Sequence, residues 1–247
     1  MNVLFNNFIF ILFEIQILLV YKKIMFKKEI FENLTLRYND HAYSGLMGFF
    51  MNQCHRQLEN VNFSNSISKV LEIGAGSAPH YKFIKHPYDE YHIVETSGTV
   101  IKKYSDNPKV IAKNYDGKIL PYEKNYFDRI IISHCLEHIV NPENFLFEMM
   151  SKLKKGGILS ISLPTDPGLL FRLGRLYLKI FSIKNKYKIS SEQFDYMNAT
   201  EHVNSIFGLS SIIKYNYGES LKESYLPFGI KLFDLNLFYN VHITKNS

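Results

Sequence analysis

The most constraining feature of the sequence is the segment from Val70 to Ala78, which reads VLEIGAGSA. A short apolar run typical of a buried strand is followed at once by Gly74 and Gly76. Glycine allows the backbone to turn sharply and to approach a ligand closely. The segment therefore predicts a strand that runs into a ligand-binding turn, with a helix opening after it. This strand–turn–helix unit is typical of α/β folds.

The rest of the chain continues an α/β alternation. Further short apolar runs predict strands at residues 69–73, 91–95, 110–112, 127–133 and 157–163, and helices are expected at 80–83, 98–104, 143–154 and 203–214. Such alternation predicts a parallel sheet with helices on both faces. Two aromatic-rich strands, the last at residues 236–243, are expected to add an antiparallel C-terminal strand. The sequence thus predicts an α/β fold with a mostly parallel sheet.

The 247 residues suffice for one α/β domain with a substantial core. We expect an apolar N-terminal segment at residues 1–24, a helical region at 25–65, and the α/β domain at 66–247 with an insert at 164–200. Residues 3–20 are apolar but contain Asn6, Asn7, Glu14 and Gln16, and lysines follow. Three interpretations stay open: a membrane anchor, a peripheral helix, and an extension upstream of a start at Met25.

The net charge of +6 agrees with nucleic acid or an anionic membrane as a partner. Because the lysines are scattered, a solvated surface is favoured. Cys54 and Cys135 form no CxxC motif and no Cys/His cluster with metal-ligand spacing. They predict no metal site and a reducing compartment. The expected location is cytoplasmic, with anchoring to the inner face of the membrane as an alternative.

The residues around the turn discriminate between cofactors. Glu95 follows Gly74 by 21 residues, at the end of the next predicted strand, where an acidic residue accepts hydrogen bonds from ribose. A nicotinamide cofactor needs a third glycine for its pyrophosphate, but this turn has Pro79 there. Glu72 just before the turn would repel a pyrophosphate and suits a cationic amino-acid group. Charge therefore favours S-adenosylmethionine.

Five motifs occur in order along residues 66–165: EIGAG at 72–76, Glu95, DGKILPY at 116–122, YFDRIIISHCLEHI at 126–139, and KKGGILSI at 154–161. Together they resemble the class I S-adenosylmethionine-dependent methyltransferases, in particular their small-molecule branch. The resemblance implies a Rossmann-like sheet. It also implies that Glu72, Gly74 and Gly76 border the methionine moiety and that Glu95 holds the ribose. The remaining residues that it assigns are Asp116 at the adenine amino group and His134 and Leu136 at the floor near the sulfonium.

The expected reaction is methyl transfer to an oxygen of a small molecule, with His134 and His202 as candidate bases. A looser similarity to methyltransferases of bacterial surface-polysaccharide synthesis, carried by LPTDPG, RLGR and EHVNSI, implies a sugar or a lipid-linked saccharide as acceptor. The motifs of nucleic-acid base methyltransferases, Asn/Asp-Pro-Pro-Tyr/Phe and Pro-Cys, are absent, so we expect no nucleic-acid substrate. Membrane association could come from residues 3–20 or from the amphipathic stretch 169–181, which could instead be a lid helix.

Two alternative functions remain. The chain could be a catalytically inactive S-adenosylmethionine-binding partner of another enzyme, since motifs that bind the cofactor do not guarantee chemistry. It could also be an NAD-dependent oxidoreductase or epimerase. The Tyr-x-x-x-Lys pair that such enzymes use occurs here as Tyr81 and Lys85, directly after the glycine turn and far upstream of its usual place.

Overall fold

A computed structural model of the chain describes residues 43, 45–76, 80–96, 101–104, 108–181 and 190–246. The predictions for residues 1–24, for most of 25–44, and for Ala78 and Pro79 lie outside these residues. Among the helices that are described, none has the length and apolar character needed to cross a bilayer.

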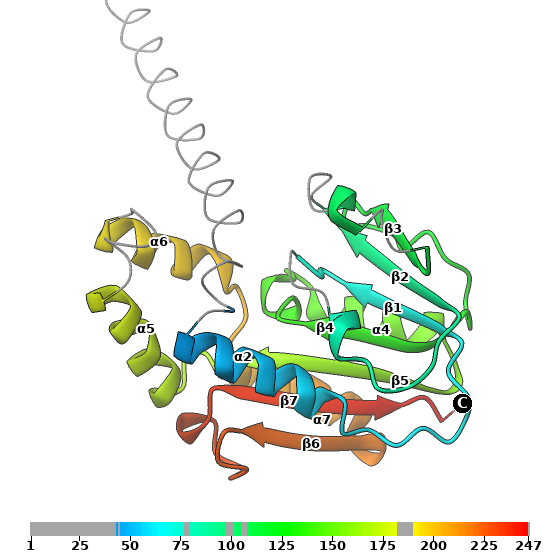
Figure 1. Ribbon diagram of the computed structural model, residues 1–247. Helices are drawn as coiled ribbons and strands as arrows, with labels where there is room; N and C mark the ends of the chain where they lie inside the picture. The colour runs from blue at the N-terminus through cyan, green and yellow to red at the C-terminus, as the bar shows by residue number, and fades with distance from the viewer. Residues whose placement is uncertain are drawn as a thin grey trace, which may run out of the picture.

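The centre of the molecule is a seven-stranded sheet (Figure 1). Its strands are β1 (Lys69–Ile73), β2 (Glu90–Glu95), β3 (Val110–Asn114), β4 (Phe127–Ser133), β5 (Leu153–Pro164), β6 (Leu221–Leu226) and β7 (Phe238–Thr244), in the spatial order β3-β2-β1-β4-β5-β7-β6. The first five strands pair in parallel, and β7 runs antiparallel to both β5 and β6. The predicted fold class, a mostly parallel sheet with an antiparallel C-terminal strand, is confirmed.

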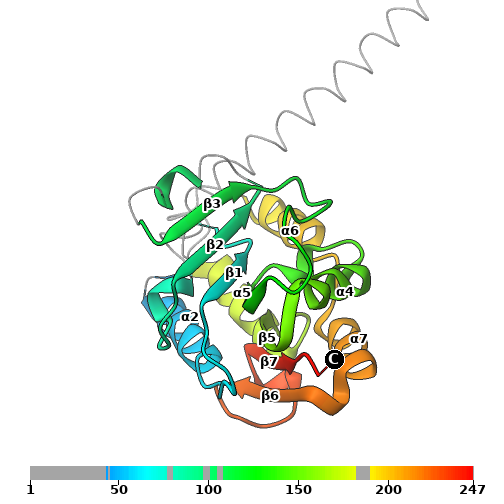
Figure 2. The ribbon, with the colours of Figure 1, turned by 90° about the vertical axis from the view of Figure 1, so that its right-hand side faces the viewer.

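Helices cover both faces of this sheet, as Figures 1 and 2 show. Helix α2 (Gly45–Leu58) packs against β5 and β7 on one face. Helices α4 (Pro142–Lys152) and α7 (Ile206–Tyr217) contact each other on the opposite face, where they bury Leu146, Met149 and Leu209 in the main core. Strands covered on both sides read as continuous apolar runs, which explains why β1 and β4 could be recognised from sequence.

Two helix boundaries differ from the prediction. Helix α4 has the expected start, since Asn141 accepts a hydrogen bond from the Asn144 N–H at 3.3 Å and Pro142 follows. It ends at Lys152 instead of residue 154, because Leu153 already has extended backbone angles and opens β5. Helix α7 begins three residues later than predicted, because the Ser205 hydroxyl caps it by accepting from the Gly208 N–H at 3.2 Å.

Two short helical segments lie on the β1–β3 side of the sheet. The segment after the glycine turn has the predicted bounds and forms a single 3₁₀ turn, η1 (His80–Phe83). The helix predicted at 98–104 is described only at its end, as the 3₁₀ turn η2 (Lys102–Tyr104).

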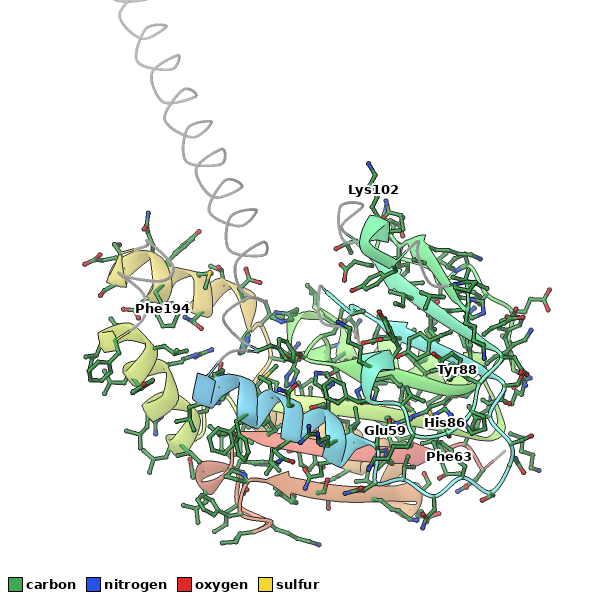
Figure 3. All side chains as sticks on the ribbon, viewed as in Figure 1. Glu59, Phe63, His86, Tyr88, Lys102 and Phe194 are labelled. Atoms are coloured by element: carbon green, nitrogen blue, oxygen red, sulfur yellow. The ribbon has the colours of Figure 1, made fainter. Side chains whose placement is uncertain are left out.

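A buried ionic network joins the C-terminal end of α2 to β4 and η1. The Arg129 guanidinium on β4 is fully buried and donates to Glu59 Oε1 at 2.6 Å and to the Leu58 carbonyl at 3.1 Å. Glu59 also lies 2.7 Å from the Nε2 of His80, and His86 lies 3.0 Å from Arg129. Figure 3 shows Glu59 and His86 close together beyond the end of α2. Removing one partner of such a buried pair costs about 3–5 kcal/mol.

The predicted insert folds into two helices beyond the carboxyl end of β5, α5 (Leu169–Phe181) and α6 (Ser191–Glu201) (Figure 1). Helix α6 begins with a capping box in which Ser190 and Gln193 bond each other's backbone N–H groups. The apolar stripe predicted on α5 is present, but it faces outward: Leu173 is 52% exposed and Ile180 64%. The opposite side of α5, with Phe171, Gly174 and Leu178, faces a cavity.

Candidate active site

A cavity of about 340 Å³ lies at the carboxyl ends of β1, β4 and β5, where ligands of open α/β sheets bind. One wall is formed by the turn after β1, and the floor by the segment that follows β4. Helices α2, α5 and α6 close the remaining sides. The polar and glycine residues of its lining include Glu72, Gly74, Gly76, His134, Glu137, His138, Arg175 and His202.

The glycine turn forms its wall with backbone alone. Gly74 and Gly76 have φ angles of 66° and 55°, in the left-handed region that glycine adopts readily. A Cβ atom on Gly74 would lie only 2.7 Å from the Cys135 Sγ. The backbone is held in place because the Gly74 N–H donates to the Val94 carbonyl at 2.9 Å. The backbone angles at Gly74 and Gly76 therefore favour glycine at both positions of this wall.

Glu72 supplies a carboxylate to the same wall. Its side chain is buried and accepts hydrogen bonds from the His80 N–H at 2.8 Å and from the Tyr91 hydroxyl at 2.7 Å. Burial raises the pKa of Glu72 to about 7, against the effect of these hydrogen bonds. A buried carboxylate beside a glycine turn repels a pyrophosphate and attracts an ammonium group. The wall therefore fits the amino-acid end of S-adenosylmethionine.

The two other predicted acidic residues lie at the ends of neighbouring strands. Glu95 ends β2 and accepts from the N–H groups of Gly76 at 3.0 Å and Thr96 at 2.8 Å. Asp116 follows β3, is exposed, and accepts from the Lys118 N–H at 3.0 Å. Residues 77–79 and 97–100, which come after β1 and β2, are outside the described part of the chain. The structure thus places Glu95 in contact with the glycine turn, and Asp116 further along the same edge.

Leu136 does not line the cavity. Its side chain is fully buried in the main core, in the 3₁₀ turn η3 (Leu136–His138), whereas its neighbour Glu137 reaches the cavity. The reason is that successive residues of a tight turn point in different directions. The resemblance assigned Leu136 to the floor near the sulfonium, whereas in the structure the side chain that this turn presents to the cavity is that of Glu137.

His134 lines the cavity and is tightly packed. It has a positive φ of 53°, donates its backbone N–H to the Ser162 carbonyl at 3.0 Å, and packs its ring against Phe238 at 5.2 Å. Burial, with additional effects of His202 and His138, lowers the pKa of His134 to about 3. The imidazole is therefore neutral at physiological pH and is a weak proton acceptor.

His202 is held by a charged pair. Its Nδ1 lies 2.7 Å from Asp166 Oδ2, and Arg175 binds the same carboxylate through two nitrogens at 3.0 and 2.6 Å. Burial alone would raise the pKa of Asp166, but the hydrogen bond from His202 and the charge of Arg175 lower it. A carboxylate at Nδ1 orients the ring and leaves Nε2 as the proton acceptor, as in other carboxylate–histidine pairs.

Sequence reasoning missed several residues of the cavity. Arg175 lines the cavity and Asp166 lies behind it; both bind His202, and the sequence analysis assigned neither a role. Glu137 was also missed, although it lies in the recognised LEHI motif. The position of Asp166 two residues beyond the end of β5 is a signal that could have identified it, because polar residues at strand ends face the cavity.

The fold and the site together define a class of protein: an α/β enzyme whose cavity combines a glycine turn, a buried carboxylate and a histidine pair. Residues 71–161 match the family model described as "Methyltransferase domain". This segment is a methyltransferase domain of the class I, S-adenosylmethionine-dependent type, as its motifs predicted. S-adenosylmethionine is the cofactor of that class. No curated protein matches the chain in sequence.

Solved structures share the fold over most of the chain. A Thermotoga maritima methyltransferase, described as a possible histamine N-methyltransferase, has 20% identity and a TM-score of 0.57, over 88% of this chain and 99% of that one. The plantazolicin methyltransferase BpumL, in complex with SAH, has 13% identity and a TM-score of 0.56, over 90% and 99%. The N-methyltransferase NodS from Bradyrhizobium japonicum has 15% identity and a TM-score of 0.53, over 80% and 97%. At these identities the likeness establishes the fold.

Proposed function

We propose that this methyltransferase transfers a methyl group from S-adenosylmethionine to a hydroxyl oxygen of a small molecule, of the sugar or lipid-linked saccharide class. The observation that carries the proposal is the cavity, which is bounded at one end by the glycine turn and Glu72 and at the other by the His202–Asp166 pair. In this proposal a cofactor site and a polar acceptor site share one cavity.

The proposed roles follow from what methyl transfer needs. When bound, S-adenosylmethionine supplies a methyl group on a positively charged sulfur. The protein then has to align the acceptor, exclude water and take up the hydroxyl proton. In this proposal Glu72, Gly74, Gly76, Glu95 and Asp116 hold the cofactor, with Glu72 at the ammonium group and Glu95 at the ribose.

Of the two candidate bases, the geometry favours His202. Its ring is oriented by Asp166, whereas the pKa of His134 is lowered to about 3 by burial. We therefore propose that His202 accepts the acceptor proton and that His134 shapes the cavity beside the transferred group. An amine acceptor would not need such a proton acceptor to the same degree, which is why an oxygen acceptor is proposed.

The outer face of the acceptor side supports a lipid-linked acceptor. The helix α5 contacts the β6–β7 connection, where the Leu169 N–H donates to Asp234 Oδ1 at 2.9 Å. Phe228, Ile230 and Leu232 in that connection are exposed, as are the apolar residues of α5, and Lys231 lies among them. Exposed apolar residues accompanied by basic ones suit an anionic membrane, where lipid-linked saccharides reside. We propose peripheral contact of this surface with the cytoplasmic leaflet.

The cofactor assignment is tested by calorimetry on the full chain, with S-adenosylmethionine as ligand and NAD as control. Micromolar binding of the first and none of the second is expected. Turnover is then followed as S-adenosylhomocysteine release with a panel of hydroxylated sugars and undecaprenyl-linked saccharides, against amine acceptors. Cofactor binding without turnover on any acceptor would favour the inactive-partner alternative, and turnover on amines alone would remove the oxygen assignment.

A further inference from the structure

Three side chains with metal-ligand chemistry meet on the floor of the cavity. Glu137 and His138 come from η3 after β4, and His202 follows α6, 64 positions after His138 in the numbering of the chain. One ligand atom of each lies within 4.8 Å of the others. The rings of His138 and His202 have their centroids 5.1 Å apart, and all three residues line the cavity.

Both histidines hold Nδ1 against an oxygen outside this cluster. The Nδ1 of His138 lies 2.8 Å from the Glu201 carbonyl oxygen, and the Nδ1 of His202 lies 2.7 Å from Asp166 Oδ2. Carbonyl and carboxylate oxygens accept hydrogen bonds, so the Nδ1 of His138 carries the proton. At His202 the Nδ1 also lies 3.2 Å from Arg175 Nη2, but the contact to Asp166 is shorter and Arg175 Nη2 itself donates to Asp166 at 2.6 Å, so we assign the proton to Nδ1 there too, which leaves each Nε2 with a free lone pair. Histidines that bind metals are typically oriented in this way, with the second nitrogen donating to a carbonyl or a carboxylate.

The carboxylate of Glu137 provides the second, independent observation. The residue is 3% exposed, and its Oε2 is buried without a hydrogen-bond partner among the described residues. Its Oε1 lies 3.8 Å from the His138 Nε2, which is beyond hydrogen-bond distance. A buried polar atom without a partner is costly, and such an atom in a native cavity indicates a ligand that satisfies it.

We propose that Glu137, His138 and His202 bind a divalent transition-metal cation in this cavity. Two imidazole nitrogens and one carboxylate oxygen suit cations such as Zn²⁺, Mn²⁺ or Fe²⁺ rather than Ca²⁺, which prefers oxygen ligands. Three protein ligands also leave a coordination position open toward the cavity, as in catalytic metal sites.

A cation here would have a direct role in the proposed methyl transfer, and that role rests on the proposed function. With the cation bound, His202 is a ligand and no longer the proton acceptor of the metal-free scheme above: coordination lowers the pKa of the acceptor hydroxyl, and its proton leaves to water. The acceptor oxygen then forms its bond to the methyl carbon as the carbon–sulfur bond breaks, with the electron pair going to sulfur. The site would therefore select acceptors that offer an oxygen at this position.

The test measures metal binding without cofactor or acceptor, so its result is independent of the methyltransferase assay. The untagged full chain is stripped with EDTA, dialysed, and titrated with Zn²⁺ by calorimetry. One cation per chain with micromolar or tighter affinity is expected. Co²⁺ should give a visible absorption band that Zn²⁺ abolishes.

Matched variants locate the site. Glu137→Gln and His202→Ala should abolish the Co²⁺ band, and Asp166→Asn should weaken Zn²⁺ binding by about 10–100-fold, because Asp166 only orients a ligand. His92→Ala is the control: His92 pairs with Glu90 at 2.9 Å on β2, far from the cavity. Circular dichroism verifies that each variant is folded. The proposal is overturned if the native chain binds no Zn²⁺ at one equivalent, or if folded Glu137→Gln and His202→Ala keep native affinity. Metal binding in a chain that transfers no methyl group would support this inference and refute the proposed function instead.

Discussion

The two ends of the cavity are built on different principles. At the cofactor end, the wall is backbone and one carboxylate, all within Glu72 to Gly76 and one contact to Glu95. At the acceptor end, the wall includes the side chains of Glu137, Arg175 and His202, which come from three segments separated in the chain, and Asp166 behind them pairs with the last two. The first end is local and could be recognised from sequence. The second exists only when η3, β5, α5 and α6 come together.

The largest effect is expected at the acceptor end. His202→Ala should reduce the turnover number by about 10²–10⁴-fold, the usual contribution of a positioned acid–base group, and should change cofactor affinity less than about twofold. His134→Ala is the matched comparison, since both histidines line the cavity. Steady-state kinetics and calorimetry measure the two quantities. If His134→Ala lowered turnover as much as His202→Ala, the assignment of the proton acceptor would be wrong.

At the cofactor end, Glu95→Ala should weaken S-adenosylmethionine binding by roughly 10–100-fold, because a charge-assisted hydrogen bond contributes about 1.5–3 kcal/mol. The turnover number at saturating cofactor should change little. Glu90→Ala, on the same strand but at its other end, is the control and should bind normally. If Glu95→Ala binds the cofactor with native affinity, the assignment of Glu95 to the ribose is wrong. The cofactor end would then not be recognisable from these sequence motifs.

The outer face of α5 should separate membrane contact from catalysis. In the variant Leu176→Glu/Ile180→Glu, both side chains are exposed, so the free energy of unfolding should change by less than about 0.5 kcal/mol. Binding to vesicles of phosphatidylglycerol should fall by at least roughly tenfold, because each buried leucine or isoleucine contributes about 1.5–3 kcal/mol. Tyr215→Glu on α7, also exposed, is the control. Vesicle co-sedimentation in which all three proteins behave alike would exclude this surface.

The smallest effect concerns Glu72, whose pKa burial raises to about 7. Below that pH the carboxyl is protonated and cannot pair with the cofactor ammonium. Affinity should therefore rise roughly eightfold between about pH 6 and about pH 7.5, and Glu72→Gln should remove the rise. Calorimetry at several pH values measures it. The same raised pKa means that Glu72 stabilises the free protein at low pH, and that this contribution is lost as pH rises through about 7. A flat affinity profile in the native chain would place the ammonium elsewhere.

The sequence by itself determined the sheet and the cofactor end. Apolar runs gave β1 and β4 at their observed bounds. Gly74 and Gly76 both have the positive φ that glycine adopts most readily, and at Gly74 a Cβ would also lie too close to the Cys135 Sγ. These features could be predicted because strand burial and the sterics of a turn depend on a few adjacent residues, and therefore leave a local pattern in the sequence.

Only the tertiary structure decided the acceptor end. The sequence analysis found no metal-ligand spacing, because Glu137 and His138 are adjacent while His202 reaches them through the α5–α6 insert. It placed Leu136 at the cavity where the turn presents Glu137, and it could not decide which face of α5 meets the domain. The stripe of leucines had the right period, yet period alone does not tell which side is buried. The structure turns the Arg175 side of α5 inward, where Arg175 pairs with Asp166 and both contact His202, which lies beyond α6.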